Sequence, residues 1–332
     1  TRRLLDSSTA ECLCSELHQY RVDALHARGM AGEDRSVTNW LQRTRDYARF
    51  GIDFFLLRHD KPHILGLVTN DTCNLHCINC RVANVNHEMM SMDWIEAVLE
   101  RYYEKGVRML YLTGGEPYLW RDDKYRLPDV VRVAHDRGFL RVHVYTNGTM
   151  PLSTAPDFTW ISIDGIGSLF ETIRGIPLER VLRNARGFRG KHAIVFTINT
   201  INYRSIRASL DYFERELPGT EIMFFFHTPY YGIDALHLSQ TQRKIAVDTL
   251  LECKKDGLPV LNSATALAAY LNGTNGPPLK YSGIVAGSGD YRCCRVEGDP
   301  EICKDCGYST GFEIVQARRW RPGAIRTLLK TH

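Results

Sequence analysis

Three cysteines stand close together in this sequence, in a pattern that could bind a metal centre. Cys73, Cys77 and Cys80 are spaced as C-x3-C-x2-C and follow the apolar run Ile64–Val68. Thiolates are the usual protein ligands of iron–sulfur clusters, and three of them would leave one iron of a cubane cluster open for a substrate or cofactor. Closely spaced cysteines also occur in zinc sites and, in secreted chains, in disulfide frameworks. The rest of the sequence has to decide between these interpretations.

The composition is that of an ordinary globular protein. A chain of 332 residues with 44% hydrophobic content can bury a large core, as one barrel-sized domain with additions or as two domains. The net charge of +4 is small and the basic residues are scattered, so neither nucleic acid nor a membrane is expected as a partner. No apolar run approaches the ~20 residues of a membrane span, and no signal peptide is recognisable. We therefore expect a cytoplasmic protein, whose ten cysteines are metal ligands or buried thiols rather than disulfides.

The elements that must position the cysteines alternate between strands and helices from residue 61 to residue 257. The strands are expected at residues 64–69, 108–113, 142–146, 159–163, 193–199 and 221–227. The helices are expected at residues 92–105, 128–137, 178–188, 206–217 and 240–255, where apolar residues recur at helical spacing. Such alternation predicts parallel βαβ units with right-handed crossovers. The fold class is therefore α/β, a partial (β/α)6 TIM-type barrel.

The two ends of the chain differ from this pattern. Residues 1–60 carry leucines and aromatic residues at helical spacing, which predicts a helical N-terminal segment. After Gly257 the segment Asn272–Pro278 is rich in turn-forming residues, and four cysteines then follow within a short stretch. We expect three parts: a helical segment over 1–60, a barrel over 61–257 and a cysteine-rich extension over 258–332.

Polar residues follow several of the predicted strands at their carboxyl ends, where α/β proteins carry their functional loops. The second strand is followed by Gly114-Gly115-Glu116-Pro117, in which the glycines let a ligand approach the backbone and Glu116 could accept from an ammonium group. Asn147 follows the third strand. Ser162 and Asp164 follow the fourth and share one face of it, because side chains alternate along a strand. A simple turn, or capping of that turn by Ser162 or Asp164, would also explain these residues.

Together these motifs resemble the radical S-adenosylmethionine (SAM) superfamily. The resemblance rests on Cys73-x3-Cys77-x2-Cys80 after the first strand, Gly-Gly-Glu-Pro after the second and Ser-Ile-Asp-Gly after the fourth, and it covers roughly residues 61 to 230. The stretch from Ile161 to Gly175 is similar to the branch with a C-terminal SPASM or twitch extension. Asn79 departs from the pattern, because many members have an aromatic residue just before the third cysteine.

The resemblance implies a role for each motif. Cys73, Cys77 and Cys80 would ligate a 4Fe-4S cluster whose open iron chelates SAM, and one electron would cleave SAM to a 5′-deoxyadenosyl radical. That radical would take a hydrogen atom from a substrate C–H bond, so the protein has to orient one hydrogen and exclude competing reactions. The cofactor contacts implied are Gly114, Gly115, Glu116, Pro117, Asn147, Ser162 and Asp164. No residue is predicted to be catalytic beyond these ligands.

The C-terminal cysteines form a second candidate metal site. Cys293, Cys294, Cys303 and Cys306 could hold an auxiliary 4Fe-4S cluster, as in SPASM and twitch proteins, or could bind zinc or no metal. The match to the extension is incomplete, because no further cysteine follows Cys306. Cys253 falls on a predicted helix and is interpreted as a buried thiol.

The predicted function is hydrogen abstraction from a small polar metabolite, a sugar, aminocyclitol or nucleoside, in a bacterial biosynthetic pathway. The outcome would be dehydrogenation, decarboxylation, epimerisation or elimination, in an enzyme of the oxidoreductase or lyase type. A one-electron donor such as flavodoxin or ferredoxin is the implied partner. The alternatives are a maturase of ribosomal peptides and, more remotely, a non-catalytic iron–sulfur sensor. Candidate substrate contacts are Tyr145, Asn199, His227, Tyr230, Tyr231, Arg174, Arg292 and Arg295.

Overall fold

The computed structural model describes residues 44–57, 61–230, 232, 234–273, 281–294 and 299–331. The chain divides into two compact units, Thr1–Asp46 and Tyr47–His332, and the second unit contains the sheet and its helices. Most of the predicted helical segment over 1–60 lies outside the described residues. Within them the chain is helical over residues 47–51 and continues as a π-helix, η1 (Ile52–Leu57). How residues 61–332 divide into barrel and extension stays a prediction.

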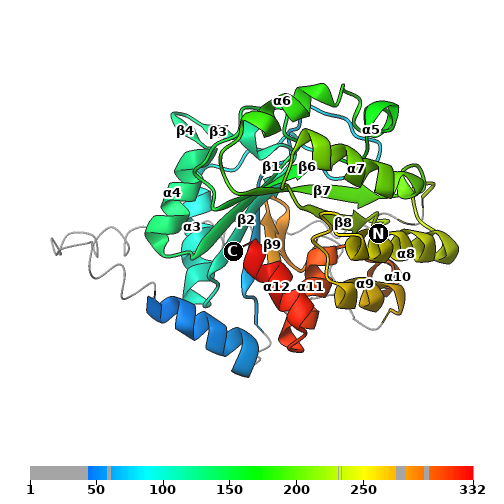
Figure 1. The fold of residues 1–332 in the computed structure, drawn as a ribbon. Helices are drawn as coiled ribbons and strands as arrows, with labels where there is room; N and C mark the ends of the chain where they lie inside the picture. The colour runs from blue at the N-terminus through cyan, green and yellow to red at the C-terminus, as the bar shows by residue number, and fades with distance from the viewer. Residues whose placement is uncertain are drawn as a thin grey trace, which may run out of the picture. The chain divides into compact units, whose positions relative to one another are not determined.

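Six parallel strands form the predicted partial barrel (Figure 1). They are β1 (Ile64–Asn70), β2 (Met109–Gly114), β5 (Arg141–Thr146), β6 (Phe158–Ser162), β7 (His192–Ile198) and β8 (Ile222–Phe226). The helices that accompany them are α3 (Met92–Glu104), α4 (Leu127–Arg137), α5 (Gly167–Arg174), α6 (Glu179–Gly187), α7 (Ile206–Glu216) and α8 (Gln240–Lys255). Short connections add η2 (Pro117–Leu119), β3 (Arg121–Asp122), β4 (Tyr125–Arg126) and η3 (Tyr203–Ser205). All six strands and five helices predicted from the sequence begin and end within one residue of these bounds, and α5 was not predicted.

The sheet does not close on itself. Its order is β10-β9-β1-β2-β5-β6-β7-β8, so β1 and β8 do not pair with each other. The region after Gly257 supplies α9 (Ala264–Leu271), β9 (Ser282–Ala286), β10 (Gly289–Arg292), α10 (Pro300–Cys303), α11 (Ser309–Arg318) and α12 (Pro322–Lys330). Strand β9 runs parallel to β1, and β10 pairs with it as an antiparallel hairpin. The extension therefore continues the sheet beyond β1.

The edge at β8 is covered by an isolated parallel bridge, Ile222 with Val260, and by single residues that follow Gly257. Ile222 N–H donates to the carbonyl of Pro259, and the side-chain amide of Asn262 bonds both the N–H and the carbonyl of Phe224 at 2.8 and 2.9 Å. Phe226 N–H donates to the carbonyl of Gly307 at 2.9 Å. Because unpaired backbone groups are costly to bury, these contacts stabilise a strand that has a neighbour on one side only.

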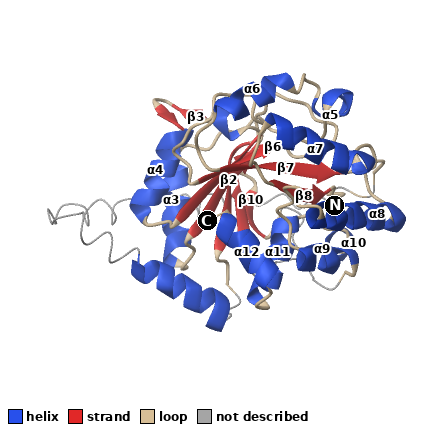
Figure 2. Ribbon diagram, viewed as in Figure 1, coloured by secondary structure: helices blue, strands red, loops and turns tan. Residues whose placement is uncertain are grey.

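Helices lie along the outside of the sheet (Figure 2). Two clusters of buried apolar side chains pack between the sheet and these helices, and a third lies inside the barrel. Leu65, Leu110 and Val142 point outward against α3 and α4, as the alternation along their strands requires. The outward faces of β6, β7 and β8 pack against the helices that follow, including α9. Inside the barrel, residues such as Phe158, Trp160 and Met223 form an apolar plug. The plug leaves the carboxyl ends of the strands for ligands.

At Gly307 the backbone lies directly against the end of β8. A Cβ atom there would lie 1.7 Å from the carbonyl oxygen of Phe226. We predict that Gly307→Ala lowers the free energy of unfolding by about 2 to 4 kcal/mol, because the methyl group separates the two backbones and breaks their hydrogen bond. Urea unfolding measures the change. Gly187→Ala is the control, because a Cβ atom there meets nothing within 4 Å; equal effects of the two variants would contradict this account.

Candidate functional site

A chamber of about 500 Å3 lies at the carboxyl ends of the barrel strands. Its rim consists of the last inward-pointing residue of five successive strands or of the turns that follow them: Thr113, Asn147, Ser162, Thr197 and His227. The residue two positions earlier on each strand points to the same side. Four of these residues also line the chamber: Tyr111, Tyr145, Val195 and Phe225. The fifth, Trp160, belongs to the apolar plug. The polar rim above an apolar floor follows from the two-residue repeat of strands.

The three motif cysteines line one wall of this chamber. They lie on the loop after β1, which two polar residues fold back on itself. Asn84 accepts a hydrogen bond from Cys73 N–H at 2.7 Å and donates to the carbonyl of Leu75 at 3.1 Å. Asp71 accepts from two backbone N–H groups farther along the loop. The loop is therefore held by its own side chains, which brings Cys73, Cys77 and Cys80 together at one site.

The thiols of this loop are poor ligands until they lose their protons. Burial raises the pKa of Cys73, and it raises the pKa of Cys77 to about 11 although the charge of Arg174 opposes the shift. Binding of a metal centre here must therefore displace protons, which makes it dependent on pH. Three thiols on one loop, facing one chamber, have the donor chemistry of an iron–sulfur site.

The two motif glycines form a close contact between β1 and β2. A Cβ atom on Gly114 would lie 2.0 Å from the carbonyl oxygen of Asn70, and one on Gly115 would lie 2.2 Å from that of Thr72. Only glycine fits both positions. Both line the chamber, so their backbone is open to a ligand. Pro117 is buried in η2 and is not a lining residue.

Glu116 lies beneath the chamber wall and is completely buried. Its carboxylate accepts hydrogen bonds from Thr146 Oγ1 at 2.8 Å, Asn147 N–H at 2.7 Å and Tyr118 N–H at 3.1 Å. Burial raises its pKa in spite of these donors. In this structure Glu116 joins the turn after β2 to the end of β5. Its predicted contact with an ammonium group stays a prediction.

Asp164 also binds neighbouring residues and does not line the chamber. Its carboxylate forms an ion pair with Arg174 at 2.6 Å and accepts from Thr197 N–H at 2.7 Å. Arg174 lines the chamber and brings a guanidinium nitrogen to 3.9 Å from Cys77 Sγ. Asn79, the residue that departs from the superfamily pattern, donates to the same carboxylate at 3.3 Å. Asp164 thus fixes a positive charge beside the cysteine loop.

Asn147 and Ser162 lie where the sequence predicts them, on the chamber wall. The Asn147 amide donates to Asn74 Oδ1 at 2.9 Å and lies 3.6 Å from Cys73 Sγ. It therefore connects the end of β5 to the cysteine loop. Both side chains can present hydrogen-bonding groups to a ligand that lies against that loop.

The C-terminal cysteines line the same chamber as the motif cysteines. Cys293 and Cys294 follow β10, whereas Cys303 ends α10 and Cys306 precedes the contact between Gly307 and β8. Burial raises the pKa of Cys306 to about 11. Within the described ranges, no three His, Cys, Asp or Glu side chains are arranged to hold a single metal ion. A cluster has a less strict requirement, because its thiolates bind different irons.

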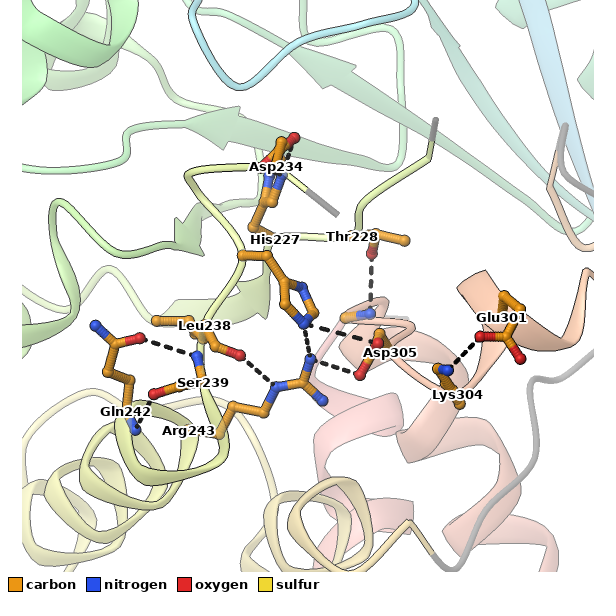
Figure 3. A network of polar contacts seen from close by, with 12 residues as sticks. His227, Thr228, Asp234, Leu238, Ser239, Gln242, Arg243, Glu301, Lys304 and Asp305 are labelled. Atoms are coloured by element: carbon orange, nitrogen blue, oxygen red, sulfur yellow. Dashed lines mark hydrogen bonds and ion pairs between the residues drawn. The ribbon is translucent and has the colours of Figure 1, made fainter. Parts of the chain in front are cut away.

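A buried ion pair attaches the Cys303–Cys306 turn to the barrel (Figure 3). Asp305 lies between these two cysteines, and its carboxylate is 2.7 Å from a guanidinium nitrogen of Arg243 on α8. Arg243 Nη2 also lies 2.8 Å from His237 Nε2. Gly307 N–H donates to Thr228 Oγ1 at 2.9 Å. The turn is therefore held by side-chain and backbone contacts on both sides of Cys306.

The remaining predicted contacts divide between the chamber and other places. Tyr145, His227 and Tyr230 line it, but Asn199 is completely buried in a turn where its Oδ1 accepts from Ile201 N–H. Arg292 is exposed on β10, and Tyr231 and Arg295 lie outside the described residues. Sequence reasoning missed the lining residues Tyr111, Thr113, Thr197, Phe225 and Tyr308. Strand alternation could have found the first four, but Tyr308 has no local signal.

Comparisons with known proteins agree on one family. Residues 67–202 match the radical SAM superfamily. A Fe-coproporphyrin III synthase of Methanosarcina barkeri is 26% identical over 233 residues, which are 64% of this chain and 56% of that protein. A probable GTP 3',8-cyclase of Sulfolobus acidocaldarius is 34% identical over 119 residues, 35% of this chain and 37% of that protein. This chain thus spans about half the length, or less, of these relatives.

Solved structures show the same fold. Native anSMEcpe with bound AdoMet superposes with a TM-score of 0.56 at 16% identity, over 74% of this chain and 79% of that one. Streptococcus suis SuiB bound to S-adenosylmethionine gives a TM-score of 0.54 at 12% identity, over 82% and 68%. The fold and the cysteine loop thus define a partial barrel of the radical SAM type. Over residues 67–202, the part that matches the family model, the chain is similar to the radical SAM superfamily, whose members use a 4Fe-4S cluster and SAM.

A SPASM or twitch extension stays a prediction for residues 258–332. A separate observation concerns membranes: in the part of the chain that the structure describes, every helix is too short or too polar to cross a bilayer.

The burial of Glu116 predicts a structural effect. In Glu116→Gln the amide group can accept through one oxygen only, so one or more of its three donors loses its partner. We predict a loss of about 2 to 4 kcal/mol in the free energy of unfolding, because each unpaired buried group is costly. Thermal unfolding of the metal-free chain measures it. Glu171→Gln, on the exposed face of α5, should change stability little; a similar loss there would contradict this explanation.

Proposed function

We propose that this chain is a radical SAM enzyme that takes a hydrogen atom from a small polar metabolite. The observation that carries the proposal is the chamber, in which Cys73, Cys77 and Cys80 face the backbone of Gly114 and Gly115. The three thiolates would hold a 4Fe-4S cluster. The glycine backbone, Asn147 and Ser162 would contact SAM, since both polar side chains lie on the chamber wall.

The cluster and SAM, when bound, would supply a carbon radical able to break an unactivated C–H bond. The chain's own residues determine what that radical meets. The apolar plug and the ring of Tyr111 close the chamber from below, which excludes water from that side. The rim hydroxyl groups of Thr113 and Thr197, at the ends of β2 and β7, can orient a polar ligand. Arg174 places a fixed positive charge beside the cysteine loop.

The C-terminal cysteines are proposed to hold an auxiliary iron–sulfur cluster. What supports this is their position: all four line the chamber that the motif cysteines line, and the Arg243–Asp305 ion pair fixes the turn that carries two of them. A cluster there could accept an electron from a substrate radical or anchor the substrate. The first role would permit net oxidation.

The chamber favours a small molecule over a peptide. Its volume of about 500 Å3 lies within the range of ~300 to 1,000 Å3 typical of small-molecule sites. The cofactor would occupy part of that space. A sugar, aminocyclitol or nucleoside fits the polar rim best. GTP and Fe-coproporphyrin III, which the names of the curated relatives suggest, and a peptide are the competing candidates.

An electron donor such as flavodoxin or ferredoxin would have to approach the cysteine loop. Cys80 is exposed, and the neighbouring Ile78 exposes 41% of its surface. This face of the loop is therefore a short path from solvent to the proposed cluster.

Cys77 tests the central assignment. After anaerobic reconstitution with iron and sulfide, dithionite and SAM should yield 5′-deoxyadenosine from the wild type. Cys77→Ala should reduce the yield by at least about 100-fold, because a cluster ligand and its electronic coupling are lost. Chromatography of the nucleoside measures the change.

Cys253→Ala is the matched control, since Cys253 is a buried thiol on α8 that does not line the chamber. It should retain the wild-type yield. Cleavage that survives Cys77→Ala would refute the assignment. The substrate class is tested with carbon-deuterated sugars, nucleosides, GTP, Fe-coproporphyrin III and a peptide. We expect the sugars or nucleosides, and not the other compounds, to transfer deuterium to 5′-deoxyadenosine.

Iron counting tests the auxiliary cluster. The variant with alanine at Cys73, Cys77 and Cys80 should retain about four irons per chain after reconstitution, because the four C-terminal cysteines are still present to bind a cluster. Alanine at Cys293, Cys294, Cys303 and Cys306 should leave about four irons at the other site. A triple variant free of iron would rule out the second cluster, and bound zinc would identify the alternative.

A further inference from the structure

His227 is the imidazole that the barrel itself presents to the chamber. It follows β8 on the same face as Met223 and Phe225, so strand alternation directs it inward. Its side chain is 5% exposed. His76 also lines the chamber, but it is an exposed residue of the cysteine loop, next to Cys77. His227 is held by the barrel, independently of that loop.

An aspartate fixes the ring of His227. His227 Nε2 lies 3.0 Å from both carboxylate oxygens of Asp234, and Asp234 Oδ1 also accepts from Leu236 N–H at 2.9 Å. Burial raises the pKa of Asp234, but the hydrogen bonds from His227 and Leu236 and the charge of His227 outweigh it, so the pKa lies below its usual value. Asp234 is therefore a carboxylate at neutral pH and can only accept at these contacts.

The carboxylate determines which ring nitrogen is available. Because Asp234 accepts, Nε2 of His227 must carry a hydrogen, which leaves Nδ1 as the basic nitrogen of the neutral ring. Among the described residues Nδ1 of His227 has no hydrogen-bond partner. Nδ1 is also absent from the set of buried polar atoms that lack a partner, so it is not buried. It therefore borders accessible space, and the space that His227 lines is the chamber.

The neighbouring histidine, His237, has a different environment. His237 does not line the chamber, and its Nε2 lies 2.8 Å from Arg243 and 3.7 Å from Asp305. Burial and the charge of Arg243 lower its pKa. His237 belongs to the contacts that attach the Cys303–Cys306 turn to α8. The His227–Asp234 pair shares no hydrogen bond with these contacts, and His227 lines the chamber.

We propose that His227, oriented by Asp234, is the proton acceptor of the reaction and that the substrate carries a hydroxyl or amino group on the carbon that loses its hydrogen. The carbon gives up a hydrogen atom to the radical supplied under the proposed function. The O–H or N–H proton passes to Nδ1 of His227, and the cluster that the C-terminal cysteines would hold would accept the remaining electron. A C=O or C=N bond forms, so the reaction is a dehydrogenation.

The arrangement suits this step in two ways. The imidazolium that forms is stabilised by Asp234, and the cysteines proposed to receive the electron line the same chamber as His227. Proton and electron thus leave the substrate toward different groups. The inference rests on the proposed function, and two experiments distinguish failure of the one from failure of the other.

The first experiment measures the ring itself and needs no cofactor. In the full chain labelled with 15N-histidine, before iron is added, a pH titration should show that the neutral ring of His227 is the Nε2-protonated tautomer. His227→Gln identifies the signal by its loss. Asp234→Asn should give a mixture of tautomers, because an amide can donate as well as accept. A wild-type ring protonated on Nδ1 would overturn the proposal, because no base would then face the chamber.

The second experiment uses the reconstituted enzyme with perdeuterated glycerol, in which every carbon bears both a deuterium and a hydroxyl group. The measured quantity is the ratio of trapped carbonyl product to deuterated 5′-deoxyadenosine. His227→Gln should lower this ratio by about 100-fold, since general-base catalysis contributes ~10²- to 10⁴-fold. Asp234→Asn should lower it less, and Asp234→Glu should restore part of it.

The outcomes separate the two proposals. His135→Gln is the control: it removes another His–Asp pair, with His135 Nε2 3.2 Å from Asp157, that lies outside the chamber, and the ratio should not change. An unchanged ratio in His227→Gln would overturn the role of His227. Absence of 5′-deoxyadenosine from the wild type would instead refute the proposed function. If glycerol transfers no deuterium to 5′-deoxyadenosine, the tautomer of His227 measured in the first experiment decides whether the proposed role of His227 stands.

Discussion

Six parallel strands cannot close a barrel here, and the two open edges are the constraint on which the structure depends. Backbone groups along an uncovered edge would be buried without partners or left as a template for aggregation. The chain meets this with residues that follow the last barrel helix. The β9–β10 hairpin continues the sheet at β1, while Asn262 and Gly307 bond to β8. The residues after Gly257 are therefore a structural part of the same sheet.

The same contacts explain why two sets of cysteines share one chamber. Cys293 and Cys294 follow the hairpin that covers the β1 edge, and Cys306 directly precedes the glycine that covers the β8 edge. The motif cysteines lie on the loop that leaves β1 itself. Covering the two edges of the sheet thus brings both sets to the carboxyl ends of the strands. The motif cysteines and Cys293–Cys294 are placed by the strands that they follow, and Cys303 and Cys306 by the contacts of their turn with α8 and β8.

The sequence predicted what depends on local periodicity. Strands and helices of the barrel are specified by apolar residues at two-residue or helical spacing, and the glycine and cysteine motifs mark the loops at the strand ends. It could not predict contacts between distant segments. Nothing near Gly307 indicates that it meets Phe226, or that Tyr308 lines the chamber. Glu116 shows the same limit, because its motif suggests a ligand contact while its burial depends on donors after β5.

The cover on β8 also restricts how another chain can bind. Asn262 imitates a peptide group: its amide donates to and accepts from the same residue, Phe224, as a neighbouring strand would. A side chain ends the ladder there, whereas a strand would have offered a new edge on its far side. An extended peptide that added a strand at β8 would first have to displace the Asn262 amide from the backbone of Phe224.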